Sequence, residues 1–332
     1  MIPVPQPVLN ALAQSMGTTG AQLTHFAGGG EPNDGAIYAF PHENGRRLLK
    51  IMAFSGQDQE RARFRFEERL RFMRYLGEHG APIAYPLLSP QETLYETYLS
   101  EAHLWVGYCM DVAPGKTVAP NAWDERFFAN WGQTVGMLHR LAIEYPSWKA
   151  SVDPRTGQET LTWREEWQGF YDWCQEEDVR AKWVEIREQL EALPIAREVH
   201  GFIHNDPHIW NLLVDRERIT VLDFDVANHH WLVNDVAIAC QSVLMALTGG
   251  LDRPVHDPDK LRAFLSLFMA GYAREYALPP GWLDHRLDLF IAYRRILLFI
   301  VMHGWISSEP SRRASWKEMI HTQPPVIGSL DL

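Results

Sequence analysis

The chain has 332 residues and a formal net charge of -11, and 46% of its residues are hydrophobic and 22% charged. This composition is that of a globular protein with a real core, and the length suits one large or two ordinary domains. The acidic balance argues against non-specific nucleic-acid binding, which requires Lys and Arg to neutralise phosphates. It is compatible with a cationic substrate.

The cysteines and the chain start indicate the compartment. None of the three cysteines lies in a CxxC pair, so we expect neither a disulfide framework nor a zinc site. The N-terminus, MIPVPQPVLNALAQS, lacks the basic start and apolar core of a signal peptide. The longest apolar run, 296–302, is far too short to span a membrane. We therefore expect a soluble cytoplasmic protein with no membrane partner, of undetermined oligomeric state.

The first third of the chain reads mainly as strands. A short helix is expected over 5–16, followed by strands over 21–55 with a hairpin turn at 43–45. Apolar residues then recur at helical spacing over 56–80, and the Gly and Pro that follow end this long helix. An alternating segment over 92–111 breaks at Ser100-Glu101, which predicts a second hairpin.

A lobe boundary is expected where the stretch 112–120, rich in Pro and Gly, breaks both periodicities. We predict an α+β protein with a bilobal arrangement. Its N-terminal lobe, 1–111, is an antiparallel sheet with one long helix, and its C-terminal lobe, 112–332, is mainly helical. The helical segments expected in the second lobe are 122–142, 162–192 (one or two helices), 235–248, 258–277 and 282–306.

The stretch HNDPHIWN, 204–211, gathers side chains that accept protons or bind metals. Two strand-like runs follow it, with a polar turn at Arg216-Glu217. Antiparallel pairing about that turn places Asn211 opposite Leu222 or Asp223. Asp206 lies just before the hairpin, so three oxygen-bearing side chains share one small volume. Such ligands suit Mg²⁺, which usually keeps several waters and completes its shell with phosphates.

The spacing D-x-x-x-x-N followed by D-F is the layout of a kinase catalytic loop and its metal-binding strand. The stretch 200–239 resembles the aminoglycoside phosphotransferase/choline kinase family, which has a protein-kinase-like fold. Within that family it looks closest to the bacterial stress-response kinase and homoserine kinase II-like branch. The resemblance implies a phosphotransferase that depends on ATP and Mg²⁺. The matching residues are His204, Asp206, His208, Asn211, Asp223, Asp225 and Asp235-Val236-Ala237.

The resemblance also implies a role for each residue. Asp206 would orient the acceptor hydroxyl and take its proton, although an Asp can also cap a turn. Asn211 and Asp223 would bind Mg²⁺, or only form hydrogen bonds at the hairpin end. Asp235 would anchor the catalytic loop by accepting backbone N–H groups.

Three further residues of this stretch have less definite roles. His208 would contact substrate or only pack, and Asp225 would touch metal or substrate or remain solvated. His204 is expected to be a buried structural histidine.

The first lobe would bind the nucleotide. Lys50 stands in an apolar strand, where a charge needs a partner. By resemblance it holds the α- and β-phosphates and pairs with Glu68, with Glu67 as the alternative partner. The alternative is that Lys50 has no such role and simply extends from an edge strand into water.

Two other segments of the first lobe complete the expected nucleotide site. Gly29 and Gly30 lie in the stretch GGGEPNDG, where kinases fold a loop over the phosphates, but glycines also form plain turns. Met110 and Val112 fall where the resemblance places the hinge whose backbone contacts adenine.

The sequence says less about the molecule that would accept the phosphoryl group. The segment 162–178 is acidic and aromatic, and Trp210 and Trp231 lie near the catalytic loop in sequence. Trp faces beside carboxylates suit an amine-bearing acceptor, although Trp residues at helical spacing also build cores. The leading hypothesis is a kinase of a small hydroxylated metabolite. The alternatives are a Ser/Thr protein kinase of the stress-response type and a noncatalytic nucleotide-binding regulator.

Overall fold

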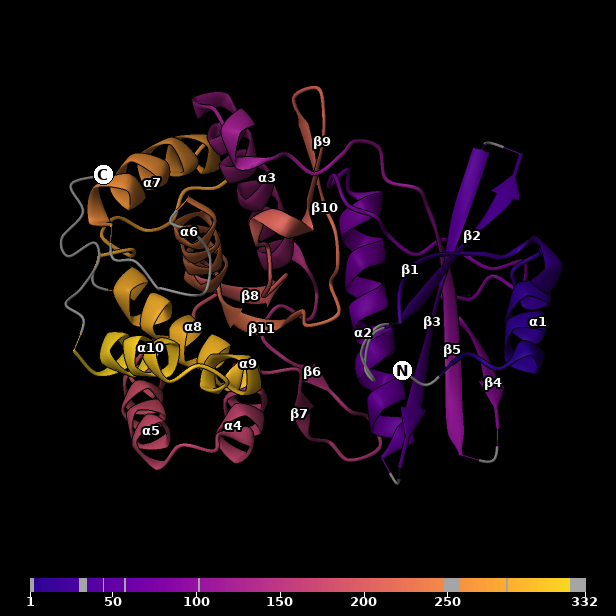
Figure 1. Cartoon of the computed structure of the whole chain (residues 1–332). Coiled ribbons are helices and arrows are strands. Elements are labelled where there is room, and N and C mark those ends of the chain that lie inside the picture. The colour runs from indigo at the N-terminus through magenta and orange to yellow at the C-terminus, as the bar shows by residue number, and fades with distance from the viewer. Residues whose placement is uncertain are drawn as a thin grey trace. The chain divides into compact units, whose positions relative to one another are not determined.

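A computed structural model describes residues 3–29, 35–43, 45–56, 58–100, 102–247, 257–284 and 286–322. The chain divides into two compact units, Met1–Pro114 with Asp153–Thr156, and Gly115–Val152 with Gly157–Leu332. The first unit is built on an antiparallel sheet and the second mainly on helices (Figure 1). The predicted α+β fold class is confirmed. The sequence did not indicate that the segment Asp153–Thr156 groups with the first unit.

The first unit contains a five-stranded antiparallel sheet with the strand order β1-β2-β3-β5-β4. His42 pairs with Gly45, which confirms the predicted turn at 43–45. The N–H of Ser100 donates to the carbonyl of His103 at 2.9 Å, which confirms the second hairpin. The elements are α1 (Gln6–Ser15), β1 (Thr24–Gly28), β2 (Ala36–His42), β3 (Gly45–Ser55), α2 (Gln59–Glu78), β4 (Glu96–Leu99) and β5 (His103–Asp111).

The two helices of the first unit lie on opposite faces of this sheet (Figure 1). Leu49 and Ile51 join the apolar cluster beneath α1. Phe66 of α2 instead meets Tyr108, with ring centroids 5.8 Å apart. Side chains alternate along a strand, and Lys50 pairs in register with Tyr108. The Lys50 side chain therefore points toward the face that α2 covers.

The second unit combines three short strand pairs with helices. Every predicted helix is present, and the segment 282–306 breaks at Met302 into two helices. The strand pairs β6–β7 and β8–β11 and the last helix were not predicted. The elements are α3 (Glu125–Glu144), β6 (Ser151–Val152), β7 (Glu159–Thr160), α4 (Trp163–Trp173), α5 (Glu177–Glu191), β8 (His200–Ile203), β9 (Leu212–Asp215), β10 (Arg218–Val221), β11 (Asn228–Trp231), α6 (Val233–Leu247), α7 (Pro258–Tyr272), α8 (Arg286–Val301), α9 (His303–Ser307) and α10 (Pro310–Thr322).

Helices α3 and α7 pack with their backbones in contact. The side chain of Asp124 caps the start of α3. A Cβ added to Gly132 would lie 1.8 Å from the carbonyl oxygen of Phe268, and one added to Gly136 would lie 2.5 Å from that of Tyr272. Only glycine permits this approach. It brings α7 close enough for a hydrogen bond to His139 of α3.

The three cysteines, Cys109, Cys174 and Cys240, are all buried as free thiols. Burial raises the pKa of Cys109 to about 12, and it also raises the pKa of the other two thiols. Since the thiolate is the reactive form of cysteine, these side chains behave as small apolar groups.

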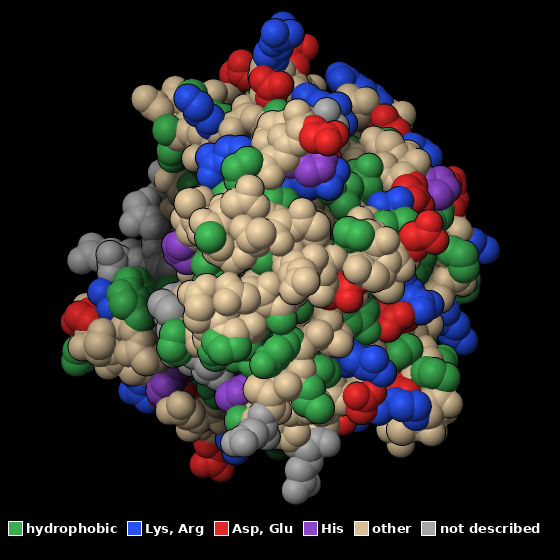
Figure 2. Space-filling model, turned by 90° about the vertical axis from the view of Figure 1, so that its right-hand side faces the viewer, with side chains coloured by type: hydrophobic (Ala, Val, Ile, Leu, Met, Phe, Trp, Pro, Cys, Tyr) green, Lys and Arg blue, Asp and Glu red, His purple; other side chains and the backbone are tan. Residues whose placement is uncertain are grey.

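Acidic and basic side chains are intermixed on the face drawn in Figure 2. The net charge of -11 is therefore not gathered into a single acidic patch on that face. Over the part of the chain that the structure describes, no helix is both long enough and apolar enough to cross a lipid bilayer.

Candidate functional site

Hydrogen bonds hold the loop that carries Asp206 in one conformation. Asn205 has a left-handed backbone (φ 66°), and its N–H donates to Asp235 Oδ1 at 2.8 Å. The N–H of Asp206 donates to His204 Nδ1 at 3.1 Å. Asn211 Nδ2 donates to the carbonyl oxygen of Asp206 at 3.0 Å. The direction of the Asp206 side chain is therefore set by its neighbours on both sides.

A buried network stands behind this loop. Asp235 lies in the first turn of α6, where a carboxylate is stabilised by the helix dipole. Its Oδ2 is 3.1 Å from His139 Nε2, and His139 Nδ1 is 2.8 Å from the Tyr272 hydroxyl. Burial holds the pKa of Tyr272 well above its usual value. The hydroxyl therefore keeps its proton and is available as a donor to Nδ1, while the Nε2 edge of His139 faces Asp235.

Both carboxylate oxygens of Asp206 have partners. Arg294 of α8 donates from Nη2 to Oδ1. His208 Nε2 lies 3.3 Å from Oδ2, and Asn211 Nδ2 lies 3.5 Å from the same oxygen. Burial lowers the pKa of His208, so its contact with Asp206 is that of a neutral imidazole. Arg294 was not predicted, although an arginine pair in an otherwise apolar helix, YRRILLFI, was a signal.

The hairpin β9–β10 forms in the predicted register. Leu212 pairs with Val221, and the N–H of Leu222 donates to the carbonyl of Asn211 at 2.9 Å. Asn211 therefore stands opposite Leu222 and beside Asp223, as the spacing predicts.

The chemistry of these two residues fits Mg²⁺. Asp223 is exposed and has a left-handed backbone (φ 65°). Asn211 turns its Nδ2 toward Asp206, so its Oδ1 faces away. The described residues hold no cluster of three or more His, Cys, Asp or Glu suited to a metal. An ion here would have one carboxylate and one amide as protein ligands and take the rest from water and phosphate, which Mg²⁺ prefers. Asp225 is half-buried, and its N–H donates to Asp223 Oδ1 at 3.3 Å.

Glu166 of α4 fixes the Asn205 side chain. Glu166 Oε2 accepts hydrogen bonds from Asn205 Nδ2 and, at 2.8 Å, from Asn228 Nδ2. Its Oε1 accepts the hydroxyl of Tyr293 at 2.6 Å. Burial raises the pKa of Glu166, and these three donors oppose the shift. The sequence marked the segment around Glu166 as acidic but gave no reason to single it out.

The structure corrects the role expected for Trp231. Its ring is fully buried, with its centroid 5.2 Å from that of Trp163, and its indole N–H donates to the carbonyl of Pro194 at 2.9 Å. The ring cannot reach a substrate because it fills the core between α4 and β11.

Two of the three tryptophans of α4 are also core residues, and the third, Trp173, is 51% exposed. Trp163 and Trp167 are buried, and their faces are already covered by the guanidinium groups of Arg164 and Arg187 at 4.5 and 4.6 Å. They offer no platform for an amine. Trp210 is different, because it is 52% exposed and lies beside His208.

In the first unit, Lys50 lies in β3, a central strand rather than an edge strand. The Lys50 side chain is buried and passes beside Gly35, where an added Cβ would lie 2.8 Å from Lys50 Cε. Glu68 is buried on α2, whereas Glu67 accepts the Tyr95 hydroxyl at 3.0 Å. Burial favours Glu68 as the partner of Lys50, and that pairing stays a prediction.

The glycine stretch connects β1 to β2, as expected from its position. Gly28 has a left-handed backbone (φ 72°), and a Cβ there would lie 2.1 Å from the carbonyl oxygen of Gly35. Gly29 is also left-handed (φ 76°), and Gly30 lies outside the described residues. Met110 is buried in β5, and Val112 follows that strand with an exposed side chain. The nucleotide contacts of these residues stay predictions.

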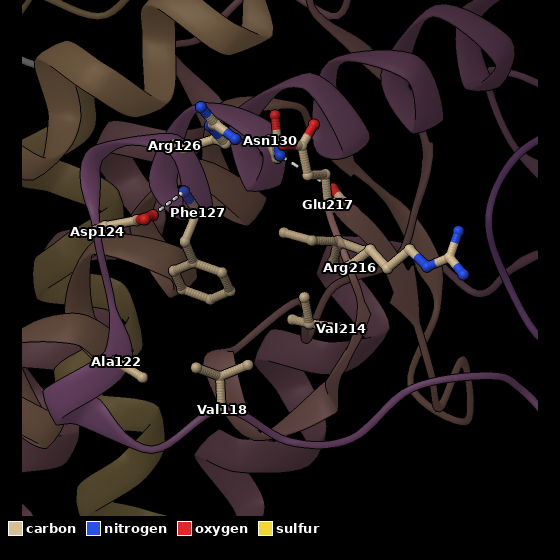
Figure 3. A pocket seen from close by; sticks show the side chains of 10 residues that line it. Val118, Ala122, Asp124, Arg126, Phe127, Asn130, Val214, Arg216 and Glu217 are labelled. Carbon is tan, nitrogen blue, oxygen red and sulfur yellow. Dashed lines mark hydrogen bonds and ion pairs between the residues drawn. The ribbon is translucent and has the colours of Figure 1, made fainter.

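A cavity of about 440 Å³ lies between the start of α3 and the β9–β10 hairpin (Figure 3). Phe127 and Val214 project into it, and Arg126 and Glu217 pair at its rim. It is distinct from the candidate site, because the catalytic-loop and metal residues predicted above do not line it. Its lining is Val118, Ala122, Asp124, Arg126, Phe127, Asn130, Val214, Arg216, Glu217 and Ile219.

Comparisons with known proteins match this chain to phosphotransferases and kinases. A family model described as the phosphotransferase enzyme family matches residues 4–286. An amicoumacin kinase from Bacillus subtilis (strain 168) is 31% identical over 198 residues, a match that spans 58% of this chain and 55% of that relative. The match thus covers about half the length of the relative.

Two solved structures share the fold at lower identity. One is an amicoumacin kinase in complex with AMP-PNP, Ca²⁺ and Ami (24% identity, TM-score 0.77, covering 92% of this chain and 90% of that one). The other is a microcompartment-associated aminopropanol kinase (17% identity, TM-score 0.63, covering 95% and 93%).

Proposed function

Because the chain belongs to the phosphotransferase enzyme family, we propose that it transfers the γ-phosphate of ATP to a hydroxyl group of a small metabolite, with Mg²⁺ bound. One observation carries this proposal. The Asp206 carboxylate projects from a loop fixed by hydrogen bonds, and that same loop delivers Asn211 to the hairpin end beside Asp223. A base and two oxygen ligands are the protein parts that such a transfer requires.

Each residue then has a defined task. ATP supplies the phosphoryl group and leaves as ADP, while Asn211 and Asp223 hold the metal ion and Lys50 binds the phosphates. Asp206 orients the acceptor hydroxyl. As the new oxygen–phosphorus bond forms and the bond to the bridging oxygen breaks, the hydroxyl proton passes to Asp206. General-base assistance of this kind contributes about 10²- to 10⁴-fold.

The acceptor that we propose carries an amine as well as a hydroxyl. The aminopropanol kinase with the same fold is named for such a compound. A half-buried carboxylate, Asp225, stands by the metal residues and suits a cation. With Trp163 and Trp167 in the core, carboxylates rather than these two indole faces would bind the amine.

The test is acceptor-dependent release of ADP by the full chain with ATP and Mg²⁺. The panel holds aminopropanol, other amino alcohols, aminoglycosides, amicoumacin and a basic protein. Asp206→Asn is the matched control, because it keeps the shape and removes the base. Release with a small acceptor that Asp206→Asn abolishes supports the proposal. Labelling of the basic protein alone would favour the protein-kinase alternative, and failure to bind ATP with Mg²⁺ would favour the regulator.

A further inference from the structure

Arg294 donates to one of the two carboxylate oxygens of the proposed base, Asp206. Its Nη2 donates to Asp206 Oδ1, and both side chains are largely shielded from water, with exposed fractions of 13% and 23%. His208 and Asn211 are placed at the other oxygen, Oδ2. Each carboxylate oxygen can accept more than one hydrogen bond, so an acceptor hydroxyl that bonds to Asp206 would share an oxygen with one of these donors.

The position of Arg294 does not depend on Asp206 alone. The preceding residue, Tyr293, donates its hydroxyl to Glu166 Oε1 at 2.6 Å. The charge of Arg294 also lies close enough to Glu166 to favour the ionised form of that carboxyl group. Helix α8 therefore keeps the guanidinium group near the loop even when its bond to Asp206 breaks.

Proximity limits where the released guanidinium group can go. A base lies about 2.6–3.2 Å from the hydroxyl whose proton it takes, and reacting atoms approach to about 3–3.5 Å. A group bonded to Asp206 is therefore within a few ångströms of the phosphoryl group in transit.

We propose that Arg294 is a further catalytic residue, a cation that exchanges the Asp206 carboxylate for the phosphoryl group as transfer begins. The exchange leaves Asp206 Oδ1 to the acceptor hydroxyl alone and places a planar, permanently charged donor against the oxygens that gain charge. The exchange makes and breaks no covalent bond beyond those of the phosphoryl transfer. This inference rests on the proposed function.

The decisive readout is nucleotide binding, measured by titration calorimetry with Mg²⁺ and no acceptor. Asp206→Asn removes the carboxylate that holds Arg294, so in that variant the guanidinium group is free to reach the terminal phosphate. Adding Arg294→Ala to Asp206→Asn should weaken ATP binding by about 10-fold or more, as expected for a charge-assisted bond. ADP lacks the γ-phosphate, so its affinity should change by less than about 2-fold.

Turnover gives a second readout. Arg294→Ala should lower kcat by about 10²- to 10³-fold, the usual effect of removing one donor to a developing charge, and added guanidinium should restore part of it. Arg262→Ala is the matched control, since Arg262 is an exposed arginine of the same unit whose partner among the described residues is its helix neighbour Asp259. It should leave both readouts unchanged.

The failures are distinguishable. If the double variant loses affinity for ATP and ADP equally, or for neither, the role assigned to Arg294 is overturned while the proposed function stands. If wild type neither binds ATP with Mg²⁺ nor releases ADP with any acceptor, the proposed function itself fails.

Discussion

The buried carboxylate of Asp235 permits a quantitative test of how the catalytic loop is held. It accepts the N–H of Asn205 at 2.8 Å and lies 3.1 Å from His139 Nε2. Hydrogen bonds to a charged group contribute about 1.5–3 kcal/mol each. Asp235→Ala strands both donors away from water, so the free energy of unfolding should fall by about 3–6 kcal/mol.

Asp235→Asn is the matched variant. Its oxygen can still accept the Asn205 N–H, but its NH₂ group then faces His139 Nε2. His139 can move its proton to Nδ1 and donate to the Tyr272 hydroxyl, which is 2.8 Å away. The Asn205 N–H and His139 therefore each keep a hydrogen-bond partner, but a neutral one. The free energy of unfolding should then fall by only about 1–2 kcal/mol.

The assay is urea unfolding of both variants and wild type, with the free energy extrapolated to water. Equal losses for the two variants, or a loss below about 1 kcal/mol for Asp235→Ala, would refute the reasoning. The first result would mean that His139 cannot change its tautomer. The second would mean that Asp235 does not hold the loop.

Four further outcomes follow, three from the candidate site and one from a buried histidine of β8. Asp206→Asn should lower kcat by about 10²- to 10⁴-fold while ATP binds at least as tightly, which calorimetry and steady-state rates check together. Asp223→Asn should reduce the rise in thermal midpoint that ATP and Mg²⁺ produce jointly, and a chelator should abolish that rise in wild type. Lys50→Met should weaken ATP binding by about 10-fold or more; calorimetry that finds wild-type affinity would exclude Lys50 from the nucleotide site. Burial lowers the pKa of His200 to about 3, so below pH 6.5 the unfolded chain binds a proton that the folded chain does not, and stability falls as the pH drops. Between pH 8 and pH 5 this amounts to about 2 kcal/mol, a difference that His200→Phe should remove from urea unfolding measured at both pH values.

The hairpin beside the metal residues could be predicted because local rules determine it. A polar turn between two apolar runs sets the register, and the register alone places Asn211 opposite Leu222. The Asp124 cap and the turn before Gly45 follow from equally local chemistry. Such features depend on neighbours in sequence, so a single sequence contains them.

The partners of the loop could not be predicted, because they arrive through tertiary packing. Arg294 and Glu166 reach it from helices separated from it by 88 and 39 positions. Nothing local distinguishes Glu166 from the acidic residues around it. The substrate contact expected for Trp231 was wrong for a related reason, because nearness to the loop in sequence does not determine which way a ring points.

The burial of every native cysteine has a practical consequence for the nucleotide site. A thiol introduced at an exposed position would be the most reactive one in the chain, since the native thiols are shielded and hard to ionise. Val112, whose side chain is 40% exposed after β5, is such a position. A fluorophore attached to Val112→Cys would label the protein at one place without removal of any native cysteine, and it would report directly whether nucleotide arrives at the end of that strand.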